Sequence, residues 1–540
     1  MRRPAARACL AVLAGILAGA LGGVAPAAAA SVPAVCGAHW VAAWAGVPTD
    51  AANSTGLTDL IGAGGDLTLG NLKAPLEHAT VRAMLTPSIG GSTVRVRLSN
   101  RYGLVAVPFA HTTIARQAAG AGVAAVPVEV TFGGRASVTA APGEDVVSDP
   151  VAFSYAGGET LAVSTFVAAA IGKPTHHASA RQTSYFTPAG AGDHAADRAG
   201  GAFLLHTSSR PLVTGLDVRV DRPFGAVVAL GDSITDGFRG LPGLGFPETT
   251  VGIDANGRWP DVLAGRLRAA GTPLAVANVG ISGNRVLRDS GGGIAGKSFG
   301  EAALTRLDAD VLRQAGVSTV IWLEGVNDIG QKPGAPASDI IAGYRQGIAR
   351  MRAAGLRVLM GTLTPTAGAQ ASYSDATAQA ARETVNTWIR TAGGADGYID
   401  FDAAVRDPAD PARIAPAYDG GDHLHFSLAG YAALGNAVPL DRLGAPDCPK
   451  PSPAPRLNVS AARTLVVGRT TALRVRVRST GRPVRAAAVR LGAARGRTDA
   501  RGVAVLRIRP RRAGTRTLVV TKAGTRPSRT VIRVVRRRAA

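Results

Sequence analysis

The chain has 540 residues, which is too many for one ordinary domain and favours about three. Hydrophobic residues make up 46% of it and no long charged tract interrupts the first 450 residues, so large cores can form. Pro and Gly without a fixed period exclude a collagen-like fibre. The net charge of +23 belongs to the C-terminal segment: residues 451–540 carry 24 Arg and Lys and one acid, Asp499, whereas the remainder carries 36 of each sign.

The first 30 residues have the pattern of an export signal. Three arginines among the first seven residues precede an apolar run over residues 10–21, and alanines at 28–30 supply a cleavage site. The run is shorter than the roughly 20 residues of a membrane anchor, and no later stretch is long enough to span a bilayer. We therefore predict a signal peptide over residues 1–30 and a secreted protein without a transmembrane segment.

Cysteine usage agrees with export. Cys9 lies in the signal, so the mature chain keeps Cys36 and Cys448, and an even count in an exported protein favours a disulfide between them. Two free thiols are the alternative. Two cysteines without a matching histidine cluster do not make a zinc site, so we expect no metal.

Residues 31–222 are predicted to form a β-rich accessory domain, similar to a β-sandwich. Residues 93–98 alternate apolar and polar side chains, as half-buried strands do. Turns containing Gly or Pro recur between such stretches, at residues 90–91, 133–134 and 142–143.

From residue 223 the pattern changes to apolar strands that alternate with helices. Strands that are apolar throughout and separated by helices indicate a parallel sheet covered on both faces, so residues 223–447 are predicted to be an α/β domain. The predicted strands cover residues 226–230, 274–279, 317–323, 358–363 and 398–401. The predicted helices cover residues 260–270, 301–315, 338–354, 375–391 and 427–443.

A proline-rich linker is predicted over residues 448–456, where Pro alternates with other residues and stiffens the chain. Beyond it, residues 472–478 alternate with period two, and glycines at 481, 502 and 514 mark turns. We expect a small β-sandwich over residues 457–540.

The sharpest chemical signal is the motif Gly231-Asp232-Ser233, which directly follows an apolar strand. In an open parallel sheet, ligands bind outside the carboxyl ends of the strands, so Ser233 is placed where a nucleophile belongs. The tripeptide alone is a common turn, and the assignment depends on the partners that follow.

A serine nucleophile needs a base, and the base needs an orienting group. His423 and His425 are the only histidines after Ser233, in a loop between the last predicted strand and the last helix. Asp422 lies three residues before His425, close enough to reach its ring. We therefore predict His425 as the base and Asp422 as its partner, with Asp419 as an alternative partner and His423 as the weaker base.

Acyl transfer also needs hydrogen-bond donors for the developing oxyanion. Gly283 follows the strand that ends at residue 279 and can present its backbone N–H, and Asn327 follows the strand over 317–323 and can donate from its amide. The alternative for each is an ordinary turn or cap. Four predicted strands are followed by residues that catalysis needs together: the nucleophile, the base with its partner, and the two oxyanion donors. This combination favours an active site over unrelated turns.

Together these blocks resemble the SGNH (GDSL-like) hydrolases over residues 224–445. The resemblance implies a flavodoxin-like α/β fold and a catalytic triad of Ser233, Asp422 and His425. It implies an oxyanion hole from the backbone N–H groups of Ser233 and Gly283 and the side chain of Asn327. Ile234 and Phe426 stand where the family commonly has Leu and Pro, and these two departures leave the catalytic assignment unchanged.

The flanking regions carry weaker resemblances. A β-rich domain ahead of the catalytic one is similar to a group of secreted bacterial SGNH proteins, and residues 457–540 resemble bacterial immunoglobulin-like modules. The α/β-hydrolase elbow Gly-x-Ser-x-Gly fails because Thr235 stands at its fifth position.

The predicted activity is hydrolysis of carboxylic esters through an acyl-enzyme on Ser233, without a cofactor. Alternatives are acyl transfer to a sugar hydroxyl, or a polysaccharide or cell-wall binding protein with an inactive core. The segments 238–257 and 290–300 either shape the pocket or are exposed connections. The basic module predicts retention on an acidic cell-wall polymer or polysaccharide. It lacks aromatic residues for base stacking, so no specific nucleic-acid partner is expected.

Overall fold

The computed structural model describes residues 37–50, 76–239, 252–289, 299–444, 455–523 and 525–536. The predicted signal peptide, Cys36, Cys448 and all but the end of the predicted linker lie outside these residues. The chain divides into two compact units, Met1–Cys448 and Pro449–Ala540, and this division falls within the predicted linker. No helix in the described part of the chain has the length and apolar character needed to cross a membrane.

The first part of unit one consists of two antiparallel sheets and a short two-stranded pair. One sheet has the order β1 (His39–Ala45), β14 (Val213–Val220), β3 (Gly91–Ser99) and β7 (Asp145–Val147), with β8 (Val151–Tyr155) also on β3. The other has the order β12 (Leu205–Thr207), β11 (Ser184–Phe186), β2 (Ala79–Leu85), β9 (Leu161–Val167), β4 (Val107–Arg116) and β5 (Val128–Val130), with β6 (Val138–Ala140) on β4. The separate pair is β10 (His176–His177) with β13 (Arg210–Pro211).

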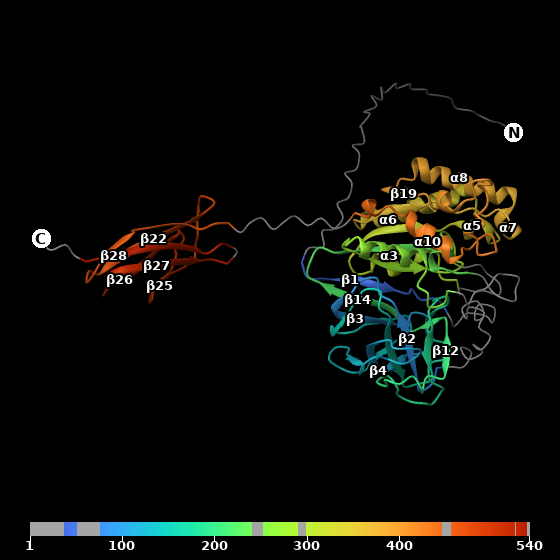
Figure 1. Cartoon of the computed structure of the whole chain (residues 1–540), viewed down its shortest axis with the longest axis horizontal. Helices are drawn as coiled ribbons and strands as arrows, with labels where there is room; N and C mark the ends of the chain where they lie inside the picture. The colour runs from blue at the N-terminus through green and yellow to red at the C-terminus, as the bar shows by residue number, and fades with distance from the viewer. Residues whose placement is uncertain are drawn as a thin grey trace, which may run out of the picture. The chain divides into compact units, whose positions relative to one another are not determined.

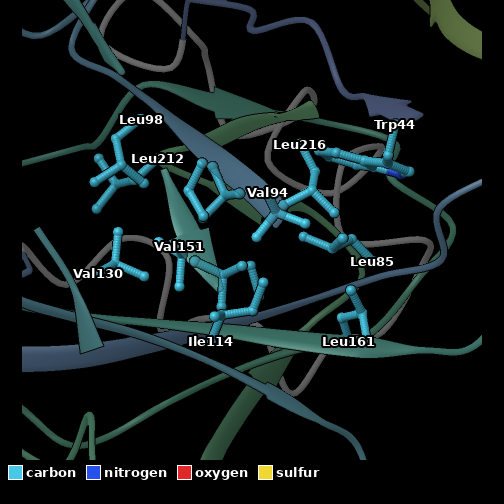
Figure 2. Packing of buried hydrophobic residues seen from close by; sticks show 14 of the residues in the cluster. Trp44, Leu85, Val94, Leu98, Ile114, Val130, Val151, Leu161, Leu212 and Leu216 are labelled. Carbon is cyan, nitrogen blue, oxygen red and sulfur yellow. The ribbon is translucent and has the colours of Figure 1, made fainter. Parts of the chain in front are cut away.

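The two sheets enclose one hydrophobic core. Val94, Val96 and Leu98 on β3 are fully buried while the residues between them are partly exposed, which confirms the period-two prediction for this stretch. Figure 2 shows Val94 beside Leu216 of β14, in the same core as Leu161 of the opposite sheet. The predicted glycine turns at 133–134 and 143 adopt positive φ, which explains the choice of glycine there.

A five-stranded sheet, parallel throughout, forms the second part of unit one (Figure 1). Its order is β16 (Leu274–Gly280), β15 (Gly225–Gly231), β17 (Val317–Leu323), β18 (Arg357–Gly361) and β19 (Gly397–Ile399). This is the order 2-1-3-4-5 of one family of doubly wound sheets, in which the carboxyl ends of the strands form the binding edge. All five predicted strands are confirmed.

Helices cover both faces of this sheet, as alternate residues of β15 show. Val228 and Leu230 pack in a core with α6 (Ala337–Ala353) and α8 (Ala376–Ala392). Val227 and Ala229 pack in a second core with α3 (Trp259–Ala269), α9 (Phe401–Val405) and α10 (Leu428–Ala437). The remaining helices are short: α2 (Ser233–Asp236), α4 (Ala303–Leu307), α5 (Val326–Gly330), α7 (Ala371–Ser374), a π-helix (Asp308–Leu312) and a 3₁₀ helix (Leu440–Leu443).

Two helix predictions differ from the structure. The helix expected over 301–315 is α4 followed by the π-helix, and the helix expected over 427–443 ends at Ala437. Pro439 explains the second difference, because the residue before a proline is disfavoured in the helical conformation and Val438 is extended. In addition, α9 lies between the last strand and the loop that carries His425, where no helix was predicted.

The β-rich part packs directly on the α/β part. β1 lies against β16, and Ala226 and Ala275 of the parallel sheet belong to the core of the antiparallel sheets. The backbone N–H of Val276 on β16 donates to Ser88 Oγ at 2.9 Å. We propose that the boundary between the two parts falls near residue 223, where antiparallel sheets give way to the parallel one.

The second unit contains two sheets around a separate core. One comprises β20 (Asn458–Ala461), β22 (Thr471–Ser479), β23 (Arg482–Pro483) and β26 (Val503–Ile508). The other has the order β21 (Thr464–Val466), β28 (Ser528–Val535), β27 (Gly514–Thr521), β24 (Ala488–Leu491) and β25 (Ala494–Arg497). The predicted turn glycines Gly481, Gly502 and Gly514 all adopt positive φ.

Candidate active site

Ser233 is the first residue of α2, immediately after β15. Asp232 caps this helix, since its Oδ1 accepts a hydrogen bond from the Ile234 N–H at 3.0 Å. Glycine is required before them: a Cβ at Gly231 would lie 2.2 Å from Thr235 Oγ1 and 2.3 Å from Leu323 O. The tight turn therefore places the Ser233 hydroxyl at the carboxyl edge of the sheet.

His425 and Asp422 complete a hydrogen-bonded chain to Ser233. His425 Nε2 lies 2.9 Å from Ser233 Oγ, and His425 Nδ1 lies 2.7 Å from Asp422 Oδ2. Because the Asp422 carboxylate accepts from Nδ1–H, Nε2 is left without a proton and can accept from the hydroxyl. The three residues predicted as a triad are thus brought together in the required order.

Asp422 is held as an anion. Its Oδ1 also accepts the backbone N–H groups of Leu424 and His425, at 3.0 and 2.8 Å. Burial alone would raise the pKa of Asp422, but the charge and hydrogen bonds of His425 outweigh it and lower this pKa well below the usual range.

The alternative assignments made from sequence are wrong. Asp419 does not face His425: its Oδ2 bonds to Nδ1 of His423, and its Oδ1 accepts from the Gly421 N–H at 2.7 Å. The His423 side chain is 45% exposed. The Asp419–His423 pair therefore stabilises the loop beside the Asp422–His425 pair and does not contact Ser233.

Gly283 and Asn327 both face the cavity at Ser233. Gly283 has φ of +80°, and a Cβ there would lie 2.7 Å from the Phe299 ring, so glycine is required. The Asn327 amide is fixed at both ends: Nδ2 donates to Asn284 O at 3.0 Å, and Oδ1 accepts from the Tyr373 hydroxyl at 2.9 Å. One N–H of the Asn327 amide is left to donate to a ligand.

The cavity has a volume of about 160 Å³ and contains every residue predicted to contact the substrate. Its lining residues are Ser233, Phe238, Ser282, Gly283, Phe299, Asn327, Gln331, Tyr373, Leu424 and His425. Phe238 packs its ring against His425, with centroids 4.8 Å apart and an interplanar angle of 68°. Phe238 and Phe299 belong to the segments 238–257 and 290–300, which were predicted either to shape the pocket or to be exposed connections. Residues 240–251 and 290–298 of these segments lie outside the described residues.

Sequence reasoning missed two carboxylates that hold the loop around Gly283. Asp328 accepts the backbone N–H groups of Val286 and Leu287, at 2.8 and 3.0 Å. Asp236 accepts from the N–H and Oγ–H of Ser282, at 2.9 and 2.7 Å. Both acids stand beside predicted site residues in the chain, but no local pattern indicates their partners.

Buried acids lie behind the nucleophile. Burial raises the pKa of Asp232 well above its usual value, that of Glu324 to about 7 and that of Asp328 to about 6. Glu324 Oε2 accepts from the Trp322 indole N–H at 2.8 Å, whereas its Oε1 has no hydrogen-bond partner and lies 3.9 Å from Arg306 Nη2.

Glu324 should therefore make stability depend on pH. The pKa of Glu324 is higher in the folded state than in the unfolded state, so the protonated side chain favours the folded state. This contribution to the free energy of unfolding is complete below about pH 4.5 and is lost as the pH rises through about 7. Its full value is about 3 kcal/mol. Glu324→Gln removes this titration. We expect the melting temperature of the wild type to fall relative to that of Glu324→Gln between about pH 5 and pH 8; parallel melting curves would contradict this.

A parallel sheet with a hydrogen-bonded Ser–His–Asp set at its carboxyl edge is an arrangement that serine hydrolases use. Residues 229–433 match the family model of the GDSL-like Lipase/Acylhydrolase family, so this part of the chain is a domain of that family. All four motif blocks lie inside the matched range.

Solved structures similar to this chain include esterases. The native aryl esterase of M. smegmatis is 19% identical, with 39% of this chain and 95% of that chain covered and a TM-score of 0.31. A carbohydrate acetylesterase from Sinorhizobium meliloti is 17% identical, with 39% and 95% covered and a TM-score of 0.32. No curated protein sequence matches the chain.

Proposed function

We propose that the protein is a secreted serine esterase that hydrolyses carboxylic esters through an acyl-enzyme on Ser233. The observation that carries this proposal is the chain of hydrogen bonds from Asp422 through His425 to Ser233, which ends in the cavity shared with Gly283 and Asn327. The match to the GDSL-like Lipase/Acylhydrolase family supports the same class of reaction.

In the proposed mechanism, His425 Nε2 takes the hydroxyl proton as Ser233 Oγ forms a bond to the ester carbonyl carbon. The negative charge that develops on the carbonyl oxygen is stabilised by the backbone N–H groups of Ser233 and Gly283 and by the Asn327 amide. When the tetrahedral intermediate collapses, the alcohol leaves with the proton from His425. Water then repeats the same steps on the acyl-enzyme and releases the acid.

We propose a short acyl group as the preferred substrate. The cavity of about 160 Å³ is smaller than the roughly 300 Å³ at which pockets for drug-sized ligands begin. Phe238, Phe299 and Leu424 give it an apolar lining near the nucleophile.

Hydrolysis of nitrophenyl acetate and a long-chain nitrophenyl ester by the mature protein tests this proposal. We expect turnover of the acetate at a higher kcat/KM than the long-chain ester. If the nitrophenyl esters react only when a sugar acceptor is added, and the acyl group is found on the sugar, the protein is an acyltransferase. If neither ester reacts under any condition, the proposal fails and a binding protein with an inactive core takes its place.

Asn327→Ala should lower kcat by roughly 10²- to 10³-fold with little change in KM, because the amide acts on the charge that develops in the transition state. Tyr373→Phe is the matched variant: it keeps the amide but removes the hydroxyl that orients it, so its loss should be smaller. Steady-state kinetics on nitrophenyl acetate measure both. An unchanged kcat for Asn327→Ala would exclude it from the oxyanion hole.

We also propose that the second unit is an immunoglobulin-like module that binds an acidic polysaccharide. Arg490 of β24 lies directly opposite Arg495 of β25. Arg497 is the next exposed residue along β25 after Arg495. Like charges opposite each other in a sheet are destabilising. The three side chains line a groove of about 570 Å³ that also includes Val519 and Thr521.

No carboxylate neutralises these arginines in the described part of the module. Its one acid, Asp499, accepts backbone N–H groups from Arg501 and Val503 in a turn, both at 2.9 Å. Arginine forks match carboxylates in bidentate geometry, so an anionic chain would relieve the repulsion.

Replacement of the three groove arginines by glutamine should abolish salt-sensitive retention of the full-length protein on immobilised polygalacturonate. The matched control changes Arg474, Arg476 and Arg478 of β22 to glutamine, which removes the same charge from the other sheet. Elution salt concentration is the measurement. Equal losses in the two triple variants would show that net charge alone binds the polymer, and no loss in either would exclude binding through this module.

A further inference from the structure

His177 joins the β-rich part to the helix that carries the nucleophile. It lies on β10 and is 4% exposed, and its Nε2 is 2.8 Å from Oδ1 of Asp236, the last residue of α2. Asp236 is itself 2% exposed and lies three residues after Ser233. The contact therefore links residues 59 apart in the sequence across the interface between the two parts.

Two hydrogen bonds orient the His177 ring. His177 Nδ1 is 2.7 Å from Val47 O, which can only accept, so Nδ1 carries a proton. Nε2 forms a second hydrogen bond, with Oδ1 of Asp236 at 2.8 Å. The ring is therefore held at both nitrogens, and it fixes the position of the Asp236 carboxyl group.

Asp236 passes this constraint to the loop of the site. Its second oxygen accepts both the backbone N–H and the hydroxyl of Ser282. Ser282 immediately precedes Gly283, so these two bonds restrict the peptide that presents the Gly283 N–H. On the other side, Gln331 Nε2 donates to Gly283 O at 2.7 Å.

We infer that His177 is a positioning residue: through Asp236 and Ser282 it holds the Ser282–Gly283 peptide in the orientation that receives the oxyanion. The inference rests on the proposed esterase function of the site. It makes the β-rich part a structural component of the active site, because that part supplies the hydrogen bond that fixes Asp236.

A histidine-to-carboxylate contact elsewhere in the β-rich part offers a matched control. His111 on β4 contacts Glu129 Oε2 at 2.9 Å and Asp193 Oδ2 at 2.6 Å. His111→Ala removes the same kind of pair without a contact to α2. His177→Gln is the conservative variant, since its amide can still donate to Asp236.

Two measurements on the full chain test the inference. First, His177→Ala should lower kcat for nitrophenyl acetate by roughly 10- to 100-fold with KM little changed, and His177→Gln should restore part of it. The ratio of kcat/KM for an ester to that for its thionoester should also fall, because sulfur gains less from an oxyanion hole. A lower kcat with an unchanged ester-to-thionoester ratio would overturn the inference.

Second, amide hydrogen exchange of the segment 281–287 reports the loop without any catalysis. Exchange should be faster in His177→Ala than in the wild type or His111→Ala, and unchanged exchange would overturn the inference. Failure of the esterase proposal can be distinguished from failure of this inference. If the esterase proposal fails, the wild type itself turns over no ester, and hydrogen exchange still decides whether His177 positions the loop.

Discussion

Ser233→Ala is expected to lower ester hydrolysis by roughly 10⁴-fold or more while the protein keeps its fold. The substitution removes the atom that forms the acyl-enzyme and leaves the Asp422–His425 pair and the proposed oxyanion donors in place. Loss of one buried hydrogen bond should change stability by only about 1 kcal/mol. Initial rates on nitrophenyl acetate, together with melting curves, measure the two effects separately.

Ser338→Ala is the matched control for this loss, because Ser338 is an exposed serine near the start of α6. It should keep full activity. A fluorophosphonate should label the wild type on Ser233 and leave Ser233→Ala unlabelled, as mass spectrometry of the digested protein would show. Activity in Ser233→Ala within tenfold of the wild type would exclude Ser233 as the nucleophile.

Asp422→Asn should lower kcat by up to roughly 10⁴-fold without loss of the loop structure. The new Oδ1 can still accept the backbone N–H groups of Leu424 and His425, while the new amide N–H₂ faces His425 Nδ1. Nδ1 would then have to accept, which moves the ring proton to Nε2. In that tautomer Nε2 cannot take the proton from Ser233.

Asp419→Asn is a closely matched control, since it makes the same change in the same loop at the carboxylate that pairs with His423. We expect it to retain activity within a few fold of the wild type, with kcat for nitrophenyl acetate as the measurement. Equal losses in the two variants would show that the loop conformation, rather than the tautomer of His425, controls activity.

The positions of Ser233, Gly283, Asn327 and His425 could be predicted because each follows a recognisable local pattern. Three of them come after an apolar strand, and parallel strands bring their carboxyl ends to one edge whatever the details of packing. The five strands of the sheet could be predicted because each is an apolar run separated from the next by a helical stretch. Asp422 could be predicted because its partner lies only three residues away.

The contacts that sequence reasoning missed are long-range or depend on local departures from regular geometry. His177 meets Asp236 only because β10 lies against α2, and neither segment has a pattern that indicates the other. The π-helix at Asp308–Leu312 interrupts an otherwise helical stretch. The two antiparallel sheets were predicted as β-rich but not in their order, because strand pairing is decided by the packed core.

The pairing of β1 with β14 sets an order of events during synthesis. His39–Ala45 must wait for Val213–Val220, nearly 170 residues later, before it has its partner, a delay of roughly ten to thirty seconds at typical rates of translation. By the time Ser233 is synthesised, every strand of the β-rich part already exists. A chain that ends before residue 213 therefore lacks the strand with which β1 pairs.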